Sequence, residues 1–271
     1  MKQRRSLIPA VLLTLPALAS HCAAALVAGD IAIIGYQDNG APDSFLIATL
    51  APIAAGEVIY FTDNGWTGSG FRGASATDGD GNENLIALTI NDPLPAGTVL
   101  SSTGSSTAAT WTASGAIPGT TTGSFANPSL GTGGEQITAF QGPVNNPLFA
   151  PSGILFLVHN GATFTPATTS GETDIPAGLS IAAGTVVHLP PTPAPDFLSG
   201  TFRLDLTDSD VASLQSSGGT KTQWLSVIAE RDNWLENAGA APSLNVLAVP
   251  EPSTAGFGGL AALAALYRRR R

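Results

Sequence analysis

The sequence predicts an all-β sandwich with long loops and one or two short helices. Short runs of β-branched and aromatic residues alternate with Gly- and Pro-rich turns, and the 271 residues include 31 Gly and 20 Pro. Long helix-favouring stretches are missing, which favours strands over helices. A jelly-roll β-barrel is the alternative architecture.

Nine segments have the composition of strands, because each is rich in β-branched, aromatic or alternating apolar residues. The strongest of these segments is Glu57-Val58-Ile59-Tyr60-Phe61-Thr62. Residues 30–36 and 44–50 are expected to form an antiparallel pair, because an Asn-Gly turn follows the first of them. The expected strands are residues 30–36, 44–50, 57–62, 85–90, 98–100, 136–141, 154–159, 185–189 and 202–206.

An Ala-Gly pair precedes an apolar strand three times, and a fourth pair follows Pro176. Glycine reaches the positive φ that a tight turn needs, so these pairs predict hairpin entries. The glycines are Gly56, Gly97, Gly178 and Gly184.

The segments between and after these strands are less regular. Residues 101–134 are rich in Ser, Thr and Gly and predict a long loop with one or two weak strands. Residues 207–214 predict a short helix capped by Asp208 or Ser209. A helical turn over residues 231–236 is expected to bury Trp234.

The first 25 residues have the layout of a secretory signal peptide. Lys2, Arg4 and Arg5 precede an apolar run, and small residues at Ala23 and Ala25 form a cleavage site. A lipid anchor at Cys22, the only cysteine, is disfavoured because His21 stands where a small residue is expected. Cleavage after Ala25 leaves a mature chain without cysteine, whose core must hold by burial alone.

The last 23 residues combine a short apolar run with a basic end. The uncharged run of residues 255–267 is about 20 Å long as a helix, shorter than the roughly 30 Å of a bilayer core. A transient anchor at the inner membrane is therefore expected, and a permanent tail anchor is the alternative. The polar motif before the run and the basic cluster after it are Val249, Pro250, Glu251, Pro252, Arg268, Arg269, Arg270 and Arg271.

This tail resembles the PEP-CTERM sorting signal of bacteria that make exopolysaccharide. The resemblance implies that an exosortase-type enzyme of the inner membrane cleaves near Pro-Glu-Pro and that the protein reaches the cell surface or the medium. The predicted signal peptide and this sorting signal together divide the chain into three parts. They are a signal peptide (1–25), a β-sandwich domain (26–248) and a sorting signal (249–271) with its short transmembrane run.

The body resembles a recurrent domain of secreted bacterial proteins and the lamin-tail type of immunoglobulin-like sandwich. The resemblance rests on GDIAIIGYQDNGAPDSFLIATL, VIYFTDNGW, LPAGTVL and GEQITAFQG, within residues 29–160. It implies an immunoglobulin-like β-sandwich and no particular activity.

Charge excludes some partners. Residues 26–249 hold four of the eleven basic and nineteen of the twenty acidic residues, a formal charge of −15. Nucleic acid and anionic lipid are poor partners for such a surface, whereas cations and neutral polymers remain compatible.

One acidic turn could bind a hard cation. Carboxylate and amide oxygens at alternating positions can wrap Ca²⁺, but Glu83 and Thr89 depart from the EF-hand pattern. A solvated turn is the alternative reading. Asp205, Asp208 and Asp210 are explained equally well by helix capping, and Asp63-Asn64 by an Asx-turn. The candidate calcium ligands are Asp78, Asp80, Asn82 and Asn84.

Catalytic signatures are missing from the sequence. Only His159 and His188 remain after signal removal, no zinc spacing or G-x-S-x-G elbow occurs, and nothing marks a pair of carboxylates. Trp66 and Trp111 lie beside Gly-rich segments and could stack on sugars, although core packing is the commoner role for tryptophan.

We therefore expect an exported, non-enzymatic surface or matrix protein with a structural or adhesive role in exopolysaccharide or biofilm. The alternatives are a calcium-assisted carbohydrate-binding module and a polysaccharide or ester hydrolase. No cofactor is required by this hypothesis, and Ca²⁺ enters only with the carbohydrate-binding alternative.

Overall fold

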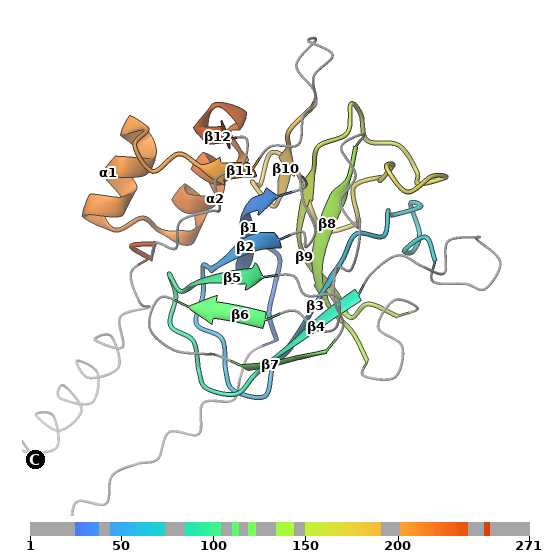
Figure 1. Cartoon of the computed structure of the whole chain (residues 1–271), viewed down its shortest axis with the longest axis horizontal. Helices are drawn as coiled ribbons and strands as arrows, with labels where there is room; N and C mark the ends of the chain where they lie inside the picture. The colour runs from blue at the N-terminus through green and yellow to red at the C-terminus, as the bar shows by residue number, and fades with distance from the viewer. Residues whose placement is uncertain are drawn as a thin grey trace, which may run out of the picture.

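The computed structural model describes residues 25–37, 44–73, 85–103, 110–113, 119–122, 134–143, 150–190, 201–237 and 247–249. Within them the chain forms two six-stranded sheets that pack face to face (Figure 1). The predicted all-β sandwich is confirmed.

The first sheet has the order β12-β11-β1-β2-β5-β6, and every pairing in it is antiparallel. β1 pairs with β2 as the sequence predicts. The strands are β1 (Ile31–Gln37), β2 (Ser44–Thr49), β5 (Val99–Thr103), β6 (Thr110–Ala113), β11 (Thr201–Leu204) and β12 (Trp234–Asn237).

The second sheet has the order β10-β9-β8-β3-β4-β7. Its edge pair β9–β10 is parallel, and parallel neighbours need a long connection, which residues 160–185 provide. The strands are β3 (Val58–Thr62), β4 (Leu85–Ile90), β7 (Gly119–Thr122), β8 (Gln136–Gln141), β9 (Gly153–His159) and β10 (Val186–His188).

The main core lies between the two sheets. Phe45 of β2 and Phe61 of β3 meet there with ring centroids 5.1 Å apart, and both side chains are fully buried. In β4 the buried residues Ile86, Leu88 and Ile90 alternate with partly exposed ones, as the period of two in a strand requires.

The connection of residues 160–185 covers the outer face of the second sheet over β3, β8 and β9. Trp66 is bonded to the 160–185 connection, because its N–H donates to Thr173 Oγ1 (2.9 Å) and its carbonyl accepts from Ala167 and Asp174. A Cβ on Gly65 would overlap the carbonyl oxygen of Glu172, so glycine permits this close approach. β3 and β8 are therefore buried on both faces.

The positive φ predicted at the four Ala-Gly turns is confirmed, but the hairpin entries predicted there are wrong. β3 and β5 each lie in a different sheet from the strand before them, β10 pairs in parallel with β9, and β10 is the first described strand after Gly178. Gly56, Gly97, Gly178 and Gly184 have φ of 89°, 86°, 93° and 70°. Each lies in the left-handed region that favours glycine.

Two helices, α1 (Ser209–Ser217) and α2 (Lys221–Ala229), pack against each other at one side of the molecule (Figure 1), and α2 contacts β1 and β10. The helix predicted over residues 207–214 is confirmed as α1, and Asp208 caps it by accepting from the N–H of Asp210. α2 was not predicted.

The helical turn expected over residues 231–236 is wrong in its second half. A 3₁₀ turn, η1, covers only Arg231–Asn233, and Trp234 starts β12 because it pairs with Leu204 of β11. The expected burial of Trp234 is confirmed at 3% exposure.

The described strands number twelve, more than the nine expected segments. β6 and β7 are the weak strands expected within residues 101–134, and β12 is the one that sequence reasoning missed.

Candidate functional site

Helix α2 is the element on which both ends of the described body meet. It begins with a capping box, in which Thr220 Oγ1 accepts from Gln223 N and Gln223 Oε1 accepts from Thr220 N (3.3 and 2.9 Å). Its inward face buries Trp224, Leu225 and Ile228. The spacing Thr-x-x-Gln before an apolar run is the local signal that could have predicted this helix.

Two glycines let α2 approach the sheets closely. A Cβ on Gly29 would come within 2.7 Å of Leu225 Cδ1, and a Cβ on Gly184 would overlap the carbonyl of Leu225. Both glycines have positive φ. α2 consequently packs against the segment before β1 and the turn before β10.

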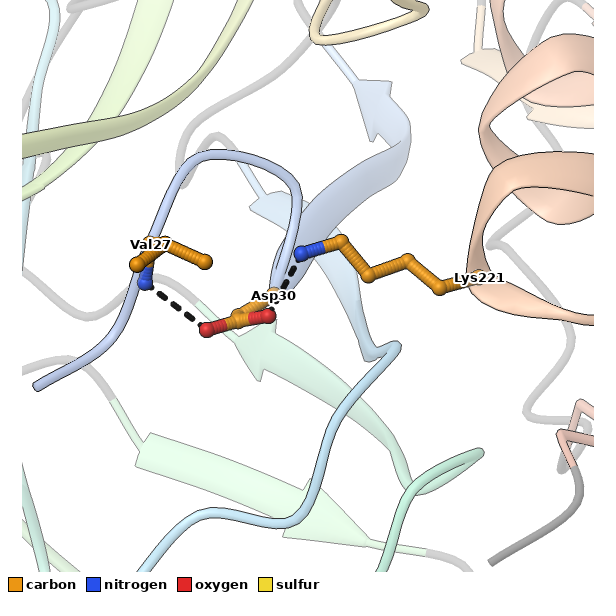
Figure 2. Close-up of polar contacts among 3 residues, drawn as sticks. All are labelled: Val27, Asp30 and Lys221. Carbon is orange, nitrogen blue, oxygen red and sulfur yellow. Dashed lines mark hydrogen bonds and ion pairs between the residues drawn. The ribbon is translucent and has the colours of Figure 1, made fainter. Parts of the chain in front are cut away.

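The N-terminal segment, residues 25–30, is held to α2 by an ion pair. Lys221 Nζ donates to Asp30 Oδ1 at 2.6 Å, and the other carboxylate oxygen accepts from the N–H of Val27 at 2.7 Å (Figure 2). The Asp30 side chain is 12% exposed and that of Lys221 31%. Leu26, which would become the first residue after cleavage at Ala25, is buried in the main core.

The C-terminal segment, residues 247–249, is named here the C-terminal strap. Leu247 is 2% exposed and belongs to the main core, and Val249 packs against that core. The Ala248 carbonyl accepts from Gly219 N (2.8 Å) and from the indole N–H of Trp224 (3.2 Å), and Ala248 N donates to Gln215 Oε1 (3.2 Å).

Gly97, in the turn before β5, completes the strap's binding place. Its carbonyl accepts from Leu247 N at 2.9 Å. A Cβ at this position would overlap the Leu247 carbonyl oxygen, so the strap depends on the missing side chain as well as on the positive φ. The strap is therefore part of the folded body.

The structure brings only one residue of the predicted sorting motif into this site. Val249 lies in the strap, whereas Pro250, Glu251, Pro252, Arg268, Arg269, Arg270 and Arg271 lie outside the described residues. The assigned boundary between body and sorting signal, 248/249, falls inside the strap.

The predicted calcium ligands Asp78, Asp80, Asn82 and Asn84 also lie outside the described residues. Within the described ranges, no group of three or more His, Cys, Asp or Glu could hold a metal ion. Asp205 accepts from the N–H and hydroxyl of Thr207 (2.9 and 2.6 Å), and Asp208 caps α1, so local capping accounts for these two carboxylates.

Of the two tryptophans proposed to stack on sugars, the structure describes the side chain of Trp66 and only the backbone of Trp111. Trp66 is 8% exposed and meets Phe71 edge to face, with centroids 5.1 Å apart. A stacking platform needs an open ring face, so sugar binding at Trp66 would require the ring to leave this cluster. Trp111 lies in β6, and its backbone alone is described.

A polar row crosses the outer face of the second sheet. Strand register places His188, His159 and Gln136 side by side on β10, β9 and β8, and Gln136 Nε2 donates to the carbonyl of Asp63, just before Asn64 and after the end of β3. The row arises from pairing between segments that are distant in the sequence, so no local sequence pattern predicts it.

The two histidines of this row contact backbone carbonyls of the 160–185 connection and of Glu135, which precedes β8. His159 Nδ1 lies 3.0 Å from the Glu135 carbonyl oxygen and Nε2 lies 3.3 Å from that of Thr163, while His188 Nε2 lies 2.9 Å from that of Gly161. The rings stack with centroids 5.9 Å apart. Desolvation by burial lowers the pKa of His159 below its ordinary value, and the neighbouring His188 adds to the effect.

Three buried oxygens of this face have no hydrogen-bond partner in the described part of the protein. They are Asn64 Oδ1, Gln136 Oε1 and Thr138 Oγ1. Neutral amide and hydroxyl oxygens suit an internal water better than Ca²⁺, which prefers carboxylates.

None of the described helices combines the length and apolar character needed to cross a bilayer. The predicted membrane run of residues 255–267 lies outside the described residues, so this finding does not concern it.

Comparison with known proteins gives one match. No curated protein and no solved structure matches the chain. Residues 248–271 match the PEP-CTERM protein-sorting motif, at the C-terminal end of the sequence. The matched segment begins inside the strap, at Ala248. The chain is thus a protein that carries a PEP-CTERM sorting motif.

Proposed function

We propose that this protein is a non-enzymatic component of the cell surface or extracellular matrix with a structural or adhesive role in exopolysaccharide or biofilm. The observation that carries the proposal is the sorting motif at residues 248–271, which indicates an extracellular protein sorted by an exosortase-type enzyme. The tail holds the chain transiently at the inner membrane, and the body is delivered outward after processing.

Several features of the body support a structural role. Its two described histidines are buried or half-buried and bind backbone carbonyls, so their ring nitrogens serve to fix a connection. The charge of −15 over residues 26–249 favours solubility and contact with cations or neutral polymers. A cysteine-free sandwich with a continuous core suits a scaffold outside the cell.

The carbohydrate-binding alternative depends on Trp111 and on the acidic turn around Asp78 and Asp80. Calorimetry of the purified protein with the host's own polymer, with and without Ca²⁺, distinguishes it from a purely structural role. Saturable binding that is lost in Trp111→Ala and in Asp80→Asn supports the binding module. The hydrolase alternative requires turnover of a polysaccharide or ester, and the absence of turnover on every tested substrate removes it.

The proposal is tested by fractionating cells of an exopolysaccharide-producing host with and without its exosortase-type enzyme. With the enzyme, the protein is expected in the matrix or surface fraction, and without it in the inner-membrane fraction. Biofilm of a strain lacking the protein should be weaker under shear, and the protein expressed in trans should restore it. An identical location in both hosts, or unchanged biofilm strength, would contradict the proposal.

A further inference from the structure

The sorting motif and the folded body share residues. The matched motif begins at residue 248, and the body binds residues 247–249 as the C-terminal strap. Ala248 and Val249 therefore belong to the segment that defines the motif and also to the packed structure. These two residues can therefore bind either the folded body or the enzyme that processes the motif.

The body uses the polar backbone groups at the start of the strap. Ala248 donates its N–H to Gln215 Oε1, and its carbonyl accepts from Gly219 and from Trp224. The Leu247 N–H donates to the Gly97 carbonyl, and the Val249 N–H donates to the carbonyl of Leu247. The last of these bonds spans only two residues, so the strap is bent between Leu247 and Val249.

Enzymes that process a peptide segment commonly bind it extended and pair with its backbone groups. The backbone groups of Ala248 cannot pair with such an enzyme while they are hydrogen-bonded to Gln215, Gly219 and Trp224. Burial of Leu247 at 2% exposure opposes its release in the same way.

We propose that docking of the C-terminal strap opposes processing of the sorting motif, because the body and the processing enzyme compete for Ala248 and Val249. The strap leaves the body before the enzyme acts, and it returns afterwards, so that the mature body keeps Val249. This inference rests on the proposed sorting by an exosortase-type enzyme.

The chain offers a matched pair of variants for a test. Gly97 and Gly56 occupy equivalent Ala-Gly turns with φ of 86° and 89°, so an alanine strains both turns alike. A Cβ at Gly97 overlaps the Leu247 carbonyl oxygen, whereas a Cβ at Gly56 meets nothing within 4 Å. The difference between Gly97→Ala and Gly56→Ala therefore isolates the strap.

The experiment is a pulse-chase of the full chain in a host that has the processing enzyme, with conversion followed by intact mass. Processing tracks the population of the open strap when opening is fast relative to cleavage. Gly97→Ala is expected to be processed about tenfold faster than Gly56→Ala, which corresponds to roughly 1.4 kcal/mol in the opening equilibrium. Hydrogen exchange at the Ala248 amide of the full chain should accelerate in the same variant.

A second pair covers the case in which Gly97→Ala does not fold. Gln215→Ala removes the acceptor of the Ala248 N–H, and Ser216→Ala alters an exposed neighbour on the same helix. One net hydrogen bond predicts about a three- to tenfold faster conversion for Gln215→Ala than for Ser216→Ala.

Equal rates within both pairs would overturn the competition, and so would slower processing of Gly97→Ala or Gln215→Ala. A mature product that ends before Leu247 would overturn it as well. The proposed function fails separately, because in that case the unaltered chain and Gly56→Ala are not converted at all and keep Arg268, Arg269, Arg270 and Arg271.

Discussion

The two ends of the described body contact the same helix through different chemistry. Residues 25–30 are joined to α2 by the ion pair of Asp30 with Lys221, at a partly exposed position. The C-terminal strap is joined by neutral bonds from Ala248 to Trp224 of α2 and to Gly219 in the connection before that helix, beside the buried Leu247. The N-terminal segment thus contacts α2 through a charged pair and the strap contacts it through neutral groups, while each segment also places one leucine, Leu26 or Leu247, in the main core.

This difference fits the order of processing that we infer. We expect the predicted signal peptide to be removed during export, before the body folds, so that the N-terminal segment docks without competition. The strap belongs to a motif that the processing enzyme must still bind, so its contacts with the body must break before processing.

Replacing Trp224 should have the largest effect. Trp224→Ala removes the largest fully buried side chain of the body and is expected to cost about 3–5 kcal/mol in the free energy of unfolding. Trp224→Phe keeps most of the bulk and removes the bond to the Ala248 carbonyl, so it should cost less and loosen the strap selectively. Urea denaturation measures the first effect and amide exchange at Ala248 the second. Unchanged amide exchange at Ala248 in Trp224→Phe would refute the role of the indole N–H in holding the strap.

The turn glycines test whether α2 is clamped to the sheets. A Cβ at Gly184 would overlap the Leu225 carbonyl, whereas one at Gly178 meets nothing within 4 Å, and both positions have positive φ. Gly184→Ala is expected to be less stable than Gly178→Ala by about 1–3 kcal/mol, the usual cost of overpacking. Thermal unfolding of the two variants measures this difference. If their stabilities coincide, α2 is not clamped at this turn.

The ion pair should contribute less, and its contribution should depend on salt. The pair is partly exposed, so Lys221→Ala is expected to cost about 1 kcal/mol at low ionic strength, and less at 1 M salt, where the Debye length is about 3 Å. Thr222→Ala, at an exposed neighbouring position, is the control. A double-mutant cycle with Asp30→Asn gives the coupling energy. A coupling that is unchanged by salt would contradict the electrostatic attachment of this end.

A pH change should act at His159 and leave the contrast between the ends intact. Burial lowers the pKa of His159 in the folded state, so the unfolded chain binds the proton more readily. Stability is therefore complete above the unfolded pKa of about 6.5 and falls as the pH drops below it, until the folded pKa is reached. Urea titrations at pH 7.5 and 5.5 should show this loss, and His159→Gln should reduce it. The same loss in His159→Gln would assign it to other groups.

The exposed carboxylate of Glu172 responds in a lower range. A hydrogen bond from the Thr168 hydroxyl lowers the pKa of Glu172 below 4.5, so its contribution is present above that value and is lost as the pH falls through the lowered pKa. The two effects can be measured apart, since pH 5.5 lies above the range of Glu172.

Local patterns in the sequence predict most of the sandwich. β1 and β2 start and end within one residue of the predicted segments, because β-branched runs and an Asn-Gly turn define them locally. The positive φ of the Ala-Gly turns is predicted equally well, because the steric need for positive φ lies in the residue itself. α2 is not predicted although Thr220 and Gln223 signal its start, because its nine residues span too few turns for the apolar positions to establish a helical period.

The candidate site could be predicted only in part. The sorting motif is recognisable from Val249 to Pro252 and from the arginine cluster, because it is a contiguous pattern. The docking of the strap depends on Gly97 and Trp224, which are distant in sequence and meet only in the folded chain. The row of His159 and His188 likewise follows from the parallel pairing of β9 with β10.

We propose that the body is exported and is separated from its sorting tail at a point beyond the docked strap. The most direct test is the intact mass of the protein recovered from outside an exopolysaccharide-producing host. The predicted mass lacks residues 1–25 and the arginines at 268–271, and its C-terminal residue lies at or after Val249. A mass that retains the four arginines would identify a tail-anchored inner-membrane protein and would contradict export with removal of the sorting tail.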